Sequence, residues 1–241
     1  MLYIIGLGIA FDLTEKSKKI INKSKVYVEC YTSWLPSEKE LRGIVGKDFS
    51  YADRKLMEDG GDGLVEEAKK EDIAILVPGD PLSATTHIDL LQRAKKADVK
   101  TEVIHNSSIL TVVARTGLQL YKFGKTASIP FPQPSHRPDT PYKIYLENQK
   151  MKAHTLFLLD MVPAEDKYMT PAEAVNYLME LGLPSDTLCI SCSRLGMDQE
   201  EIVMAKASAL AQRKSGRPPF CLIIPSGLHF MEEEVLDAFR A

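Results

Sequence analysis

The chain has 241 residues, of which 44% are hydrophobic and 26% are charged, and this composition excludes a disordered protein and suits one large or two medium domains. The 33 acidic and 30 basic residues give a net charge of −3, so no positive excess is available for binding nucleic acid. The apolar start ends at Asp12, well short of the roughly 20 residues that a membrane helix needs, and we expect a cytoplasmic protein without a membrane segment.

The first half alternates short apolar runs with helical patterns, which is typical of βαβ units and a largely parallel sheet. We expect strands at residues 2–5, 26–29, 73–77 and 103–105, and helices at 14–23, 64–71 and 88–97. A further helix should begin after Ser107 or Ser108 and reach Gly117.

The chain changes character near residue 122, so we predict an N-terminal α/β domain at 1–122 and a C-terminal α/β domain at 123–241. Four prolines within residues 131–141 predict a long loop, and such loops are usually functional or mobile. Thr170 to Glu173 form a capping box that should open a helix reaching about Leu181. We also expect strands at 155–159, 187–192, 201–205 and 220–224, and helices at 208–214 and 232–240.

The four cysteines are too few for a disulfide framework in a chain of this length. Cys189 and Cys192 form a C-x-x-C pair, but in a strand residues three apart face opposite sides. We therefore expect buried thiols and no metal site.

Gly6 and Gly8 follow the first strand, where glycines allow a cofactor to approach the backbone. The dinucleotide fingerprint fails at Phe11, where a third glycine is required. Glu29 lies where a ribose-binding acid would be expected, but a glycine turn with a solvated Glu29 carboxylate explains the pattern equally well.

Pro78-Gly79-Asp80-Pro81 directly follows the strand at 73–77, and ligands bind beyond the carboxyl ends of parallel strands. Asp80 either contacts a ligand or accepts local N–H bonds within a tight turn, and the sequence leaves both open. Polar residues also follow the next strand, at 105–108, so three strand ends could form one cleft. Because the motifs of P-loop, zinc-protease and nucleophile-elbow enzymes are absent, a reaction driven by positioning remains open.

Several of these segments together resemble the archaeal diphthine synthases. The resemblance lies in Gly6-Leu7-Gly8, Tyr31-Thr32-Ser33, the turn at 78–81 with residues 84–87, Ser108-Ile109, and above all the block 117–125. That family belongs to the tetrapyrrole-methylase superfamily, so the resemblance implies two α/β domains that bind S-adenosyl-L-methionine in a cleft between them. It further implies a homodimer that methylates the amino group of a modified histidine on translation elongation factor 2, repeatedly, to the trimethylammonium form, with S-adenosyl-L-homocysteine as the product.

The resemblance also implies which residues contact the cofactor: Ile9, Asp80, Ser83, Ser108 and Ile109 in the first domain, and Leu159, Leu195 and Phe220 in the second. Several are apolar, which fits backbone contacts and an apolar pocket wall. No general base can be named from the sequence. Two alternatives are a methyltransferase of the same fold that acts on a corrin precursor, and a Rossmann-like nucleotide-binding module.

Overall fold

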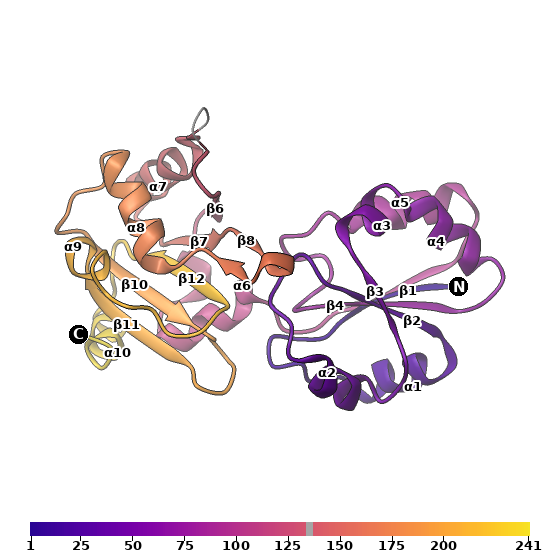
Figure 1. The fold of residues 1–241 in the computed structure, drawn as a ribbon. Helices are drawn as coiled ribbons and strands as arrows, with labels where there is room; N and C mark the ends of the chain where they lie inside the picture. Colours follow the sequence, from indigo (N-terminus) through magenta and orange to yellow (C-terminus); the bar gives the residue numbers. More distant parts are fainter. Residues whose placement is uncertain (134–136) are drawn as a thin grey trace. The chain divides into compact units, whose positions relative to one another are not determined.

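The computed structural model describes residues 1–133 and 137–241, which form two compact units, Met1–Leu110 (unit 1) and Thr111–Ala241 (unit 2) (Figure 1). The predicted domain boundary after residue 122 falls inside unit 2. Each unit is built on one five-stranded sheet.

Unit 1 is a parallel sheet with helices on both faces. Its strands are β1 (Leu2–Gly6), β2 (Lys25–Glu29), β3 (Ser50–Ala52), β4 (Ile73–Val77) and β5 (Thr101–Ile104), in the order β3-β2-β4-β1-β5. Figure 1 shows α1 (Glu15–Lys23) and α2 (Glu38–Val45) on one face, and α3 (Arg54–Glu58), α4 (Gly61–Ala68) and α5 (Ile88–Lys96) on the other.

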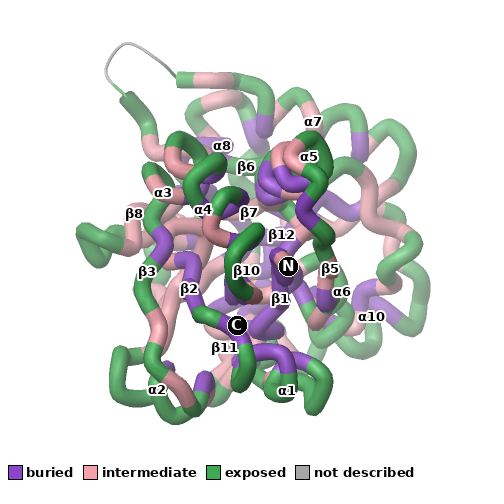
Figure 2. Tube along the Cα trace, turned by 90° about the vertical axis from the view of Figure 1, so that its right-hand side faces the viewer, coloured by how far each residue is buried: buried purple, intermediate pink, exposed green. Residues whose placement is uncertain are grey.

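Burial explains the continuous apolar runs in the central strands. Every residue of β1 and β4 is buried, as expected for parallel strands covered on both faces, and Figure 2 shows the buried stretches of β1 and β2 in purple. Local signals set the helix starts: the Thr14 hydroxyl accepts a hydrogen bond from Ser17 N at 3.1 Å and so caps α1.

Unit 2 contains a mixed sheet. Its strands are β6 (Ala127–Ile129), β7 (Thr155–Leu159), β10 (Leu188–Ser193), β11 (Glu201–Lys206) and β12 (Phe220–Ile224), in the order β11-β10-β12-β7-β6, and only β6 and β7 pair in parallel. The helices α7 (Thr140–Lys150), α8 (Pro171–Glu180) and α9 (Ala207–Leu210) share one apolar core with this sheet. Unit 2 also contains a small hairpin of β8 (Met161–Val162) and β9 (Lys167–Tyr168) and the helix α10 (Phe230–Asp237). The short helix α6 (Ile109–Val112) begins in unit 1. Three 3₁₀ turns lie at Val113–Thr116, Leu120–Lys122 and Pro163–Glu165.

Most predicted elements are confirmed, including the capping box in which the Thr170 side chain accepts from Glu173 N. The loop predicted for 131–141 was wrong at its end, because α7 begins at Thr140 and takes Pro141 into its first turn; residues 134–136 lie outside the described residues. The helix predicted for 208–214 is shorter, and the one predicted to reach Gly117 divides into α6 and a 3₁₀ turn. The sequence analysis did not identify α2, β3, α3, β6, α7 or the β8–β9 hairpin.

Cys189 and Cys192 both lie in β10, as predicted, and both are buried free thiols. Across residues 1–133 and 137–241, no three His, Cys, Asp or Glu side chains are grouped so that they could hold a metal ion. In the same residues, no helix combines the length and the apolar character needed to span a membrane.

Candidate functional site

The carboxyl edge of the unit 1 sheet contains the point where the chain reverses its direction of winding. β1 and β4 are neighbours, but the chain leaves β1 through α1 toward β2 and leaves β4 through α5 toward β5, on the opposite side. The loops that follow two such strands diverge, and ligands of open α/β sheets bind in the crevice between them. Three loops meet at this edge: residues 7–14 after β1, 78–87 after β4 and 105–108 after β5.

The first two loops touch through their glycines. Gly8 N donates to Gly79 O at 3.0 Å, and Gly79 N donates to Gly8 O at 3.2 Å. A Cβ at Gly6 would lie only 2.6 Å from the Gly79 carbonyl oxygen, so no larger residue fits there without displacing the backbone. The close approach of these loops therefore accounts for the glycine pair that sequence analysis noted after the first strand.

Asp80 joins the second loop to the third. Its Oδ1 accepts hydrogen bonds from Leu82 N at 3.0 Å and the Ser83 hydroxyl at 3.2 Å, and its Oδ2 accepts from His105 Nδ1 at 2.8 Å and Asn106 N at 3.2 Å. Burial alone would raise the pKa of this carboxyl group, but the hydrogen bonds from Leu82, His105 and Asn106 outweigh it and hold the pKa below its usual value. The carboxylate is thus an ionised anchor between two loops.

The third loop holds the first in turn. The Asn106 side chain donates to Gly6 O at 3.1 Å and to Asp12 O at 2.9 Å, and the Ser107 hydroxyl accepts from Ile9 N at 3.0 Å. Sequence analysis placed residues 105–108 at this edge but missed the role of Asn106. A polar residue directly after a strand was the available signal, but its partners are backbone carbonyls about 100 residues away, which no local pattern identifies.

A methyl-sized space remains beside Gly79, where the loops after β1 and β5 come close. A Cβ added there would lie 3.8 Å from Ser107 O and 4.0 Å from both Ile9 Cδ1 and Ser108 Cα. The space is therefore open to a small group, and backbone peptide groups and an apolar side chain border it.

Five of the eight predicted cofactor residues gather at this edge: Ile9, Asp80, Ser83, Ser108 and Ile109. Non-glycine residues with positive φ flank two of them, namely Phe11 (φ +60°) and Ala84 (φ +59°). Such conformations are rare outside glycine, asparagine and aspartate and concentrate at functional sites, because the surrounding structure must stabilise them.

The other three predicted residues meet at one edge of the unit 2 sheet. β7 and β10 both run antiparallel to β12, so the end of β7 at Leu159 and the end of β10 lie beside the start of β12 at Phe220. Arg194 N, directly before Leu195, donates to Pro219 O at 2.9 Å, and Arg194 also has a positive φ (+52°). That these three residues and the unit 1 loops bind the same cofactor remains a prediction.

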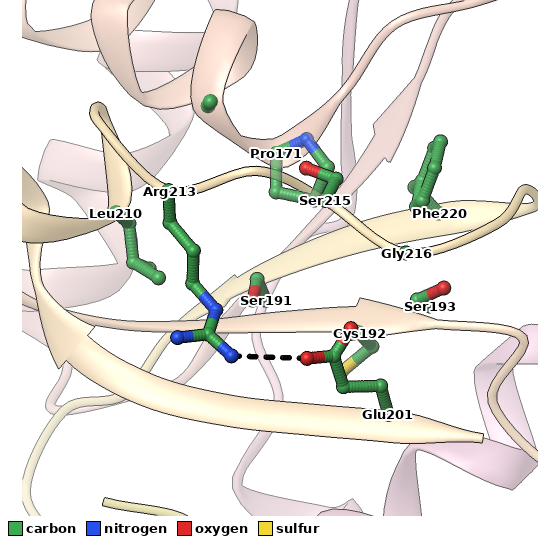
Figure 3. Close-up of a pocket in the computed structure, with 11 residues that line it drawn as sticks. Pro171, Ser191, Cys192, Ser193, Glu201, Leu210, Arg213, Ser215, Gly216 and Phe220 are labelled. Atoms are coloured by element: carbon green, nitrogen blue, oxygen red, sulfur yellow. Dashed lines mark hydrogen bonds and ion pairs between the residues drawn. The ribbon is translucent and has the colours of Figure 1, made fainter. Parts of the chain in front are cut away.

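A shallow pocket in unit 2 contains one of the predicted residues, Phe220 (Figure 3). Arg213 and Glu201 pair across it at 3.0 Å, so both charges are already neutralised. A Cβ at Gly216 would lie 2.8 Å from Ser193 Oγ, which shows how tightly the 216 loop packs on β10. The other polar side chains that line the pocket are those of Ser191, Ser193 and Ser215.

Glu29 is not the solvated carboxylate that the sequence allowed. Its side chain is fully buried, and its carboxylate accepts from Tyr31 N at 2.5 Å, from Thr32 N at 2.7 Å and from the Thr32 hydroxyl. Burial raises the pKa of this carboxyl group, although the bonds from Thr32 and Tyr31 counteract the increase. Glu29 thus fixes the loop after β2.

Comparisons with known proteins show the family and the fold. The chain matches the family of Tetrapyrrole (Corrin/Porphyrin) Methylases over residues 1–211. It is 40% identical to the diphthine synthase of Methanocaldococcus jannaschii, over 98% of this chain and 97% of that protein, and 39% identical to the diphthine methyl ester synthase of Saccharomyces cerevisiae, over 99% and 89%. A crystal structure of diphthine synthase superposes with a TM-score of 0.91 at 34% identity and covers 100% of this chain and 96% of that one.

Proposed function

Because the chain belongs to the tetrapyrrole methylases and, within them, to the diphthine synthases, we propose that it methylates the modified histidine of translation elongation factor 2. The methyl donor is S-adenosyl-L-methionine, and the acceptor is the amino group of that modified side chain. The observation that carries this proposal is similarity over nearly the whole length of relatives named for this reaction, in archaea and yeast. This similarity covers nearly all of the chain, so it counts against both alternatives, a methyltransferase of a corrin precursor and a Rossmann-like nucleotide-binding module.

The loops at the carboxyl edge of unit 1 provide one half of the cofactor site. Ile9 and Ser108 border the space beside Gly79, and Asp80 acts by holding the second and third loops together. In unit 2, Leu159, Leu195 and Phe220 supply the apolar half. Bound S-adenosylmethionine supplies a methyl group that its sulfonium charge already activates.

The residues of this chain therefore have to align and desolvate the reactants. Orientation alone can contribute on the order of 7–11 kcal/mol to lowering a barrier. Side-chain hydrogen bonds join the loops that make this alignment: Asn106 donates to Gly6 O, and the Ser107 hydroxyl accepts from Ile9 N. Little freedom therefore remains to be lost when the cofactor binds.

The number of methyl groups transferred distinguishes two candidates. Relatives of nearly equal identity are named diphthine synthase and diphthine methyl ester synthase, and the second name implies an additional ester. We infer that this chain stops at the trimethylammonium product.

We also infer a cytoplasmic homodimer, since a two-fold interface is the commonest association of soluble chains. Light scattering that gives the mass of one chain at micromolar concentration would contradict the dimer.

The decisive experiment incubates the protein with methyl-labelled S-adenosylmethionine and elongation factor 2 that carries the unmethylated modified histidine. We expect label in the factor, an intact mass that corresponds to three added methyl groups, and no label when the target histidine is replaced. A mass with a fourth, alkali-labile methyl group would identify a methyl ester synthase. Label that enters only a corrin precursor would refute the proposal, as would calorimetry that shows tight NAD binding without a response to S-adenosylhomocysteine.

A further inference from the structure

Two buried polar atoms at the carboxyl edge of unit 1 have no hydrogen-bond partner in the described part of the chain. They are the Tyr31 hydroxyl oxygen, in the loop after β2, and His87 Nε2, at the end of the loop after β4. The two rings lie edge to face with centroids 6.4 Å apart, and the His87 residue is only 3% exposed. Buried polar atoms are nearly always paired, so an orphan in each of two neighbouring rings points to a group that joins them during function.

The bonds of His87 determine which proton it carries. Its Nδ1 lies 3.1 Å from the carbonyl oxygen of Pro81, and since a carbonyl only accepts, Nδ1 must be the protonated nitrogen. In the neutral ring, Nε2 therefore presents a free lone pair. Thr85 donates to the same carbonyl at 2.5 Å, so the turn that contains Asp80 also fixes the orientation of this base.

Charged side chains from two elements lie around the pair. From β2, the buried Glu29 carboxyl group lies close enough to the imidazole to interact with it electrostatically. From α3, the Arg54 guanidinium lies 5.3 Å from the centre of the Tyr31 ring, with Glu58 nearby. Burial raises the pKa of Tyr31 to about 12, so its hydroxyl remains neutral and can accept a hydrogen bond from a cationic amine.

We propose that His87 Nε2, with the Tyr31 hydroxyl, accepts the proton that the substrate ammonium group must lose before each methyl transfer; this rests on the proposed function. The N–H bond of the ammonium breaks, its electron pair stays on nitrogen, and the proton bonds to Nε2. The amine then attacks the methyl carbon while the carbon–sulfur bond breaks and leaves its electron pair on sulfur. The imidazolium then returns its proton to water. Thr86, an exposed residue, has its side chain beside the Tyr31 hydroxyl, but no hydrogen bond of regular geometry joins the two.

The test uses His87→Asn and Tyr31→Phe. Asparagine at 87 keeps an amide N–H near the position of Nδ1 for the Pro81 carbonyl but has no basic nitrogen, and phenylalanine at 31 removes only the hydroxyl. His229→Asn and Tyr121→Phe are matched controls, because both residues are exposed and asparagine is a favourable helix cap at 229. Single-turnover methyl transfer is measured across pH, together with S-adenosylhomocysteine affinity and thermal stability.

We expect His87→Asn to bind S-adenosylhomocysteine like the parent protein but to transfer methyl roughly 10²- to 10⁴-fold more slowly at neutral pH. The deficit should shrink as pH rises, because solvent then deprotonates the amine. Parent-like rates in His87→Asn would overturn the inference, and so would a loss of rate that follows a loss of affinity or stability with an unchanged pH profile. If the parent protein itself fails to methylate the factor, the proposed function fails instead.

A measurement independent of activity tests the same base. Nitrogen NMR of ligand-free protein, followed across pH, should show that the neutral form of His87 carries its proton on Nδ1 and none on Nε2. The opposite tautomer would overturn the inference whether or not the protein is active, because Nε2 would then have no lone pair to offer.

Discussion

Replacement of Asp80 by asparagine should separate the loops that border the candidate cofactor site. The carboxylate receives two donors on each oxygen, including the backbone N–H groups of Leu82 and Asn106. An asparagine side chain has one oxygen and one NH₂ group, so in either orientation the NH₂ group faces one of these backbone donors. A buried donor left without an acceptor costs about 1–3 kcal/mol, which corresponds to a fall in Tm of roughly 2–12 °C.

The assay is thermal unfolding followed by circular dichroism without ligand, paired with calorimetry of S-adenosylhomocysteine binding. Because the pKa of Asp80 is lowered in the folded state, its contribution to stability is complete above its ordinary pKa and is lost as pH falls through the lowered value. The Tm difference between parent and variant should thus be full at pH 7 and shrink in strong acid. Asp62→Asn, at an exposed side chain, is the matched control. Weakened binding with an unchanged Tm at pH 7 would refute the anchoring role and indicate a direct ligand contact.

Three further predictions concern both units. Glu232→Gln should lower the Tm, because the buried Glu232 carboxylate pairs with Lys122. Burial alone would raise the pKa of Glu232, but its hydrogen bonds lower that pKa to about 2. Thermal melts should therefore show this stabilisation complete above the ordinary pKa of a glutamate and lost as the pH falls toward 2. Gly79→Ala should weaken S-adenosylhomocysteine binding by calorimetry at least tenfold, because the new methyl group enters the space between the loops, with about 1 kcal/mol of destabilisation from the positive φ. Thr170→Ala should cost about 1 kcal/mol in chemical denaturation through loss of the α8 cap, and Thr170→Ser should restore it.

Elements with strong local signals could be predicted from the sequence. The fully buried strand at 73–77 has an uninterrupted apolar run, and α8 carries both a capping box and a proline at its start, so both were placed correctly. By contrast, α7 begins with proline after a proline-rich stretch, and proline is equally compatible with a loop and with the first turn of a helix. Only packing of Tyr145 and its neighbours into the unit 2 core distinguishes the two possibilities.

The gathering of the candidate residues could be predicted from the sequence, but their contacts could not. Strand ends followed by glycine or polar residues lie at one edge of the sheet, because parallel strands bring their carboxyl ends together whatever lies between them in the chain. The hydrogen-bond partners of each polar group depend on contacts between segments far apart in the sequence. Asp80, for example, accepts four hydrogen bonds from the protein, two of them from the third loop, and its contact with a ligand stays a prediction.

The same contrast separates Asp80 from His87, which lie seven residues apart on one loop. A carboxylate that already accepts four hydrogen bonds would lose them in order to react, so its chemistry serves to hold the loop. The buried His87 imidazole has one nitrogen bonded to a carbonyl oxygen and the other unpaired. Desolvation of the unpaired nitrogen costs free energy, and only a new hydrogen-bond partner or a proton offsets this cost. The unsatisfied group, rather than the most highly connected one, is therefore where proton transfer should be sought in this loop.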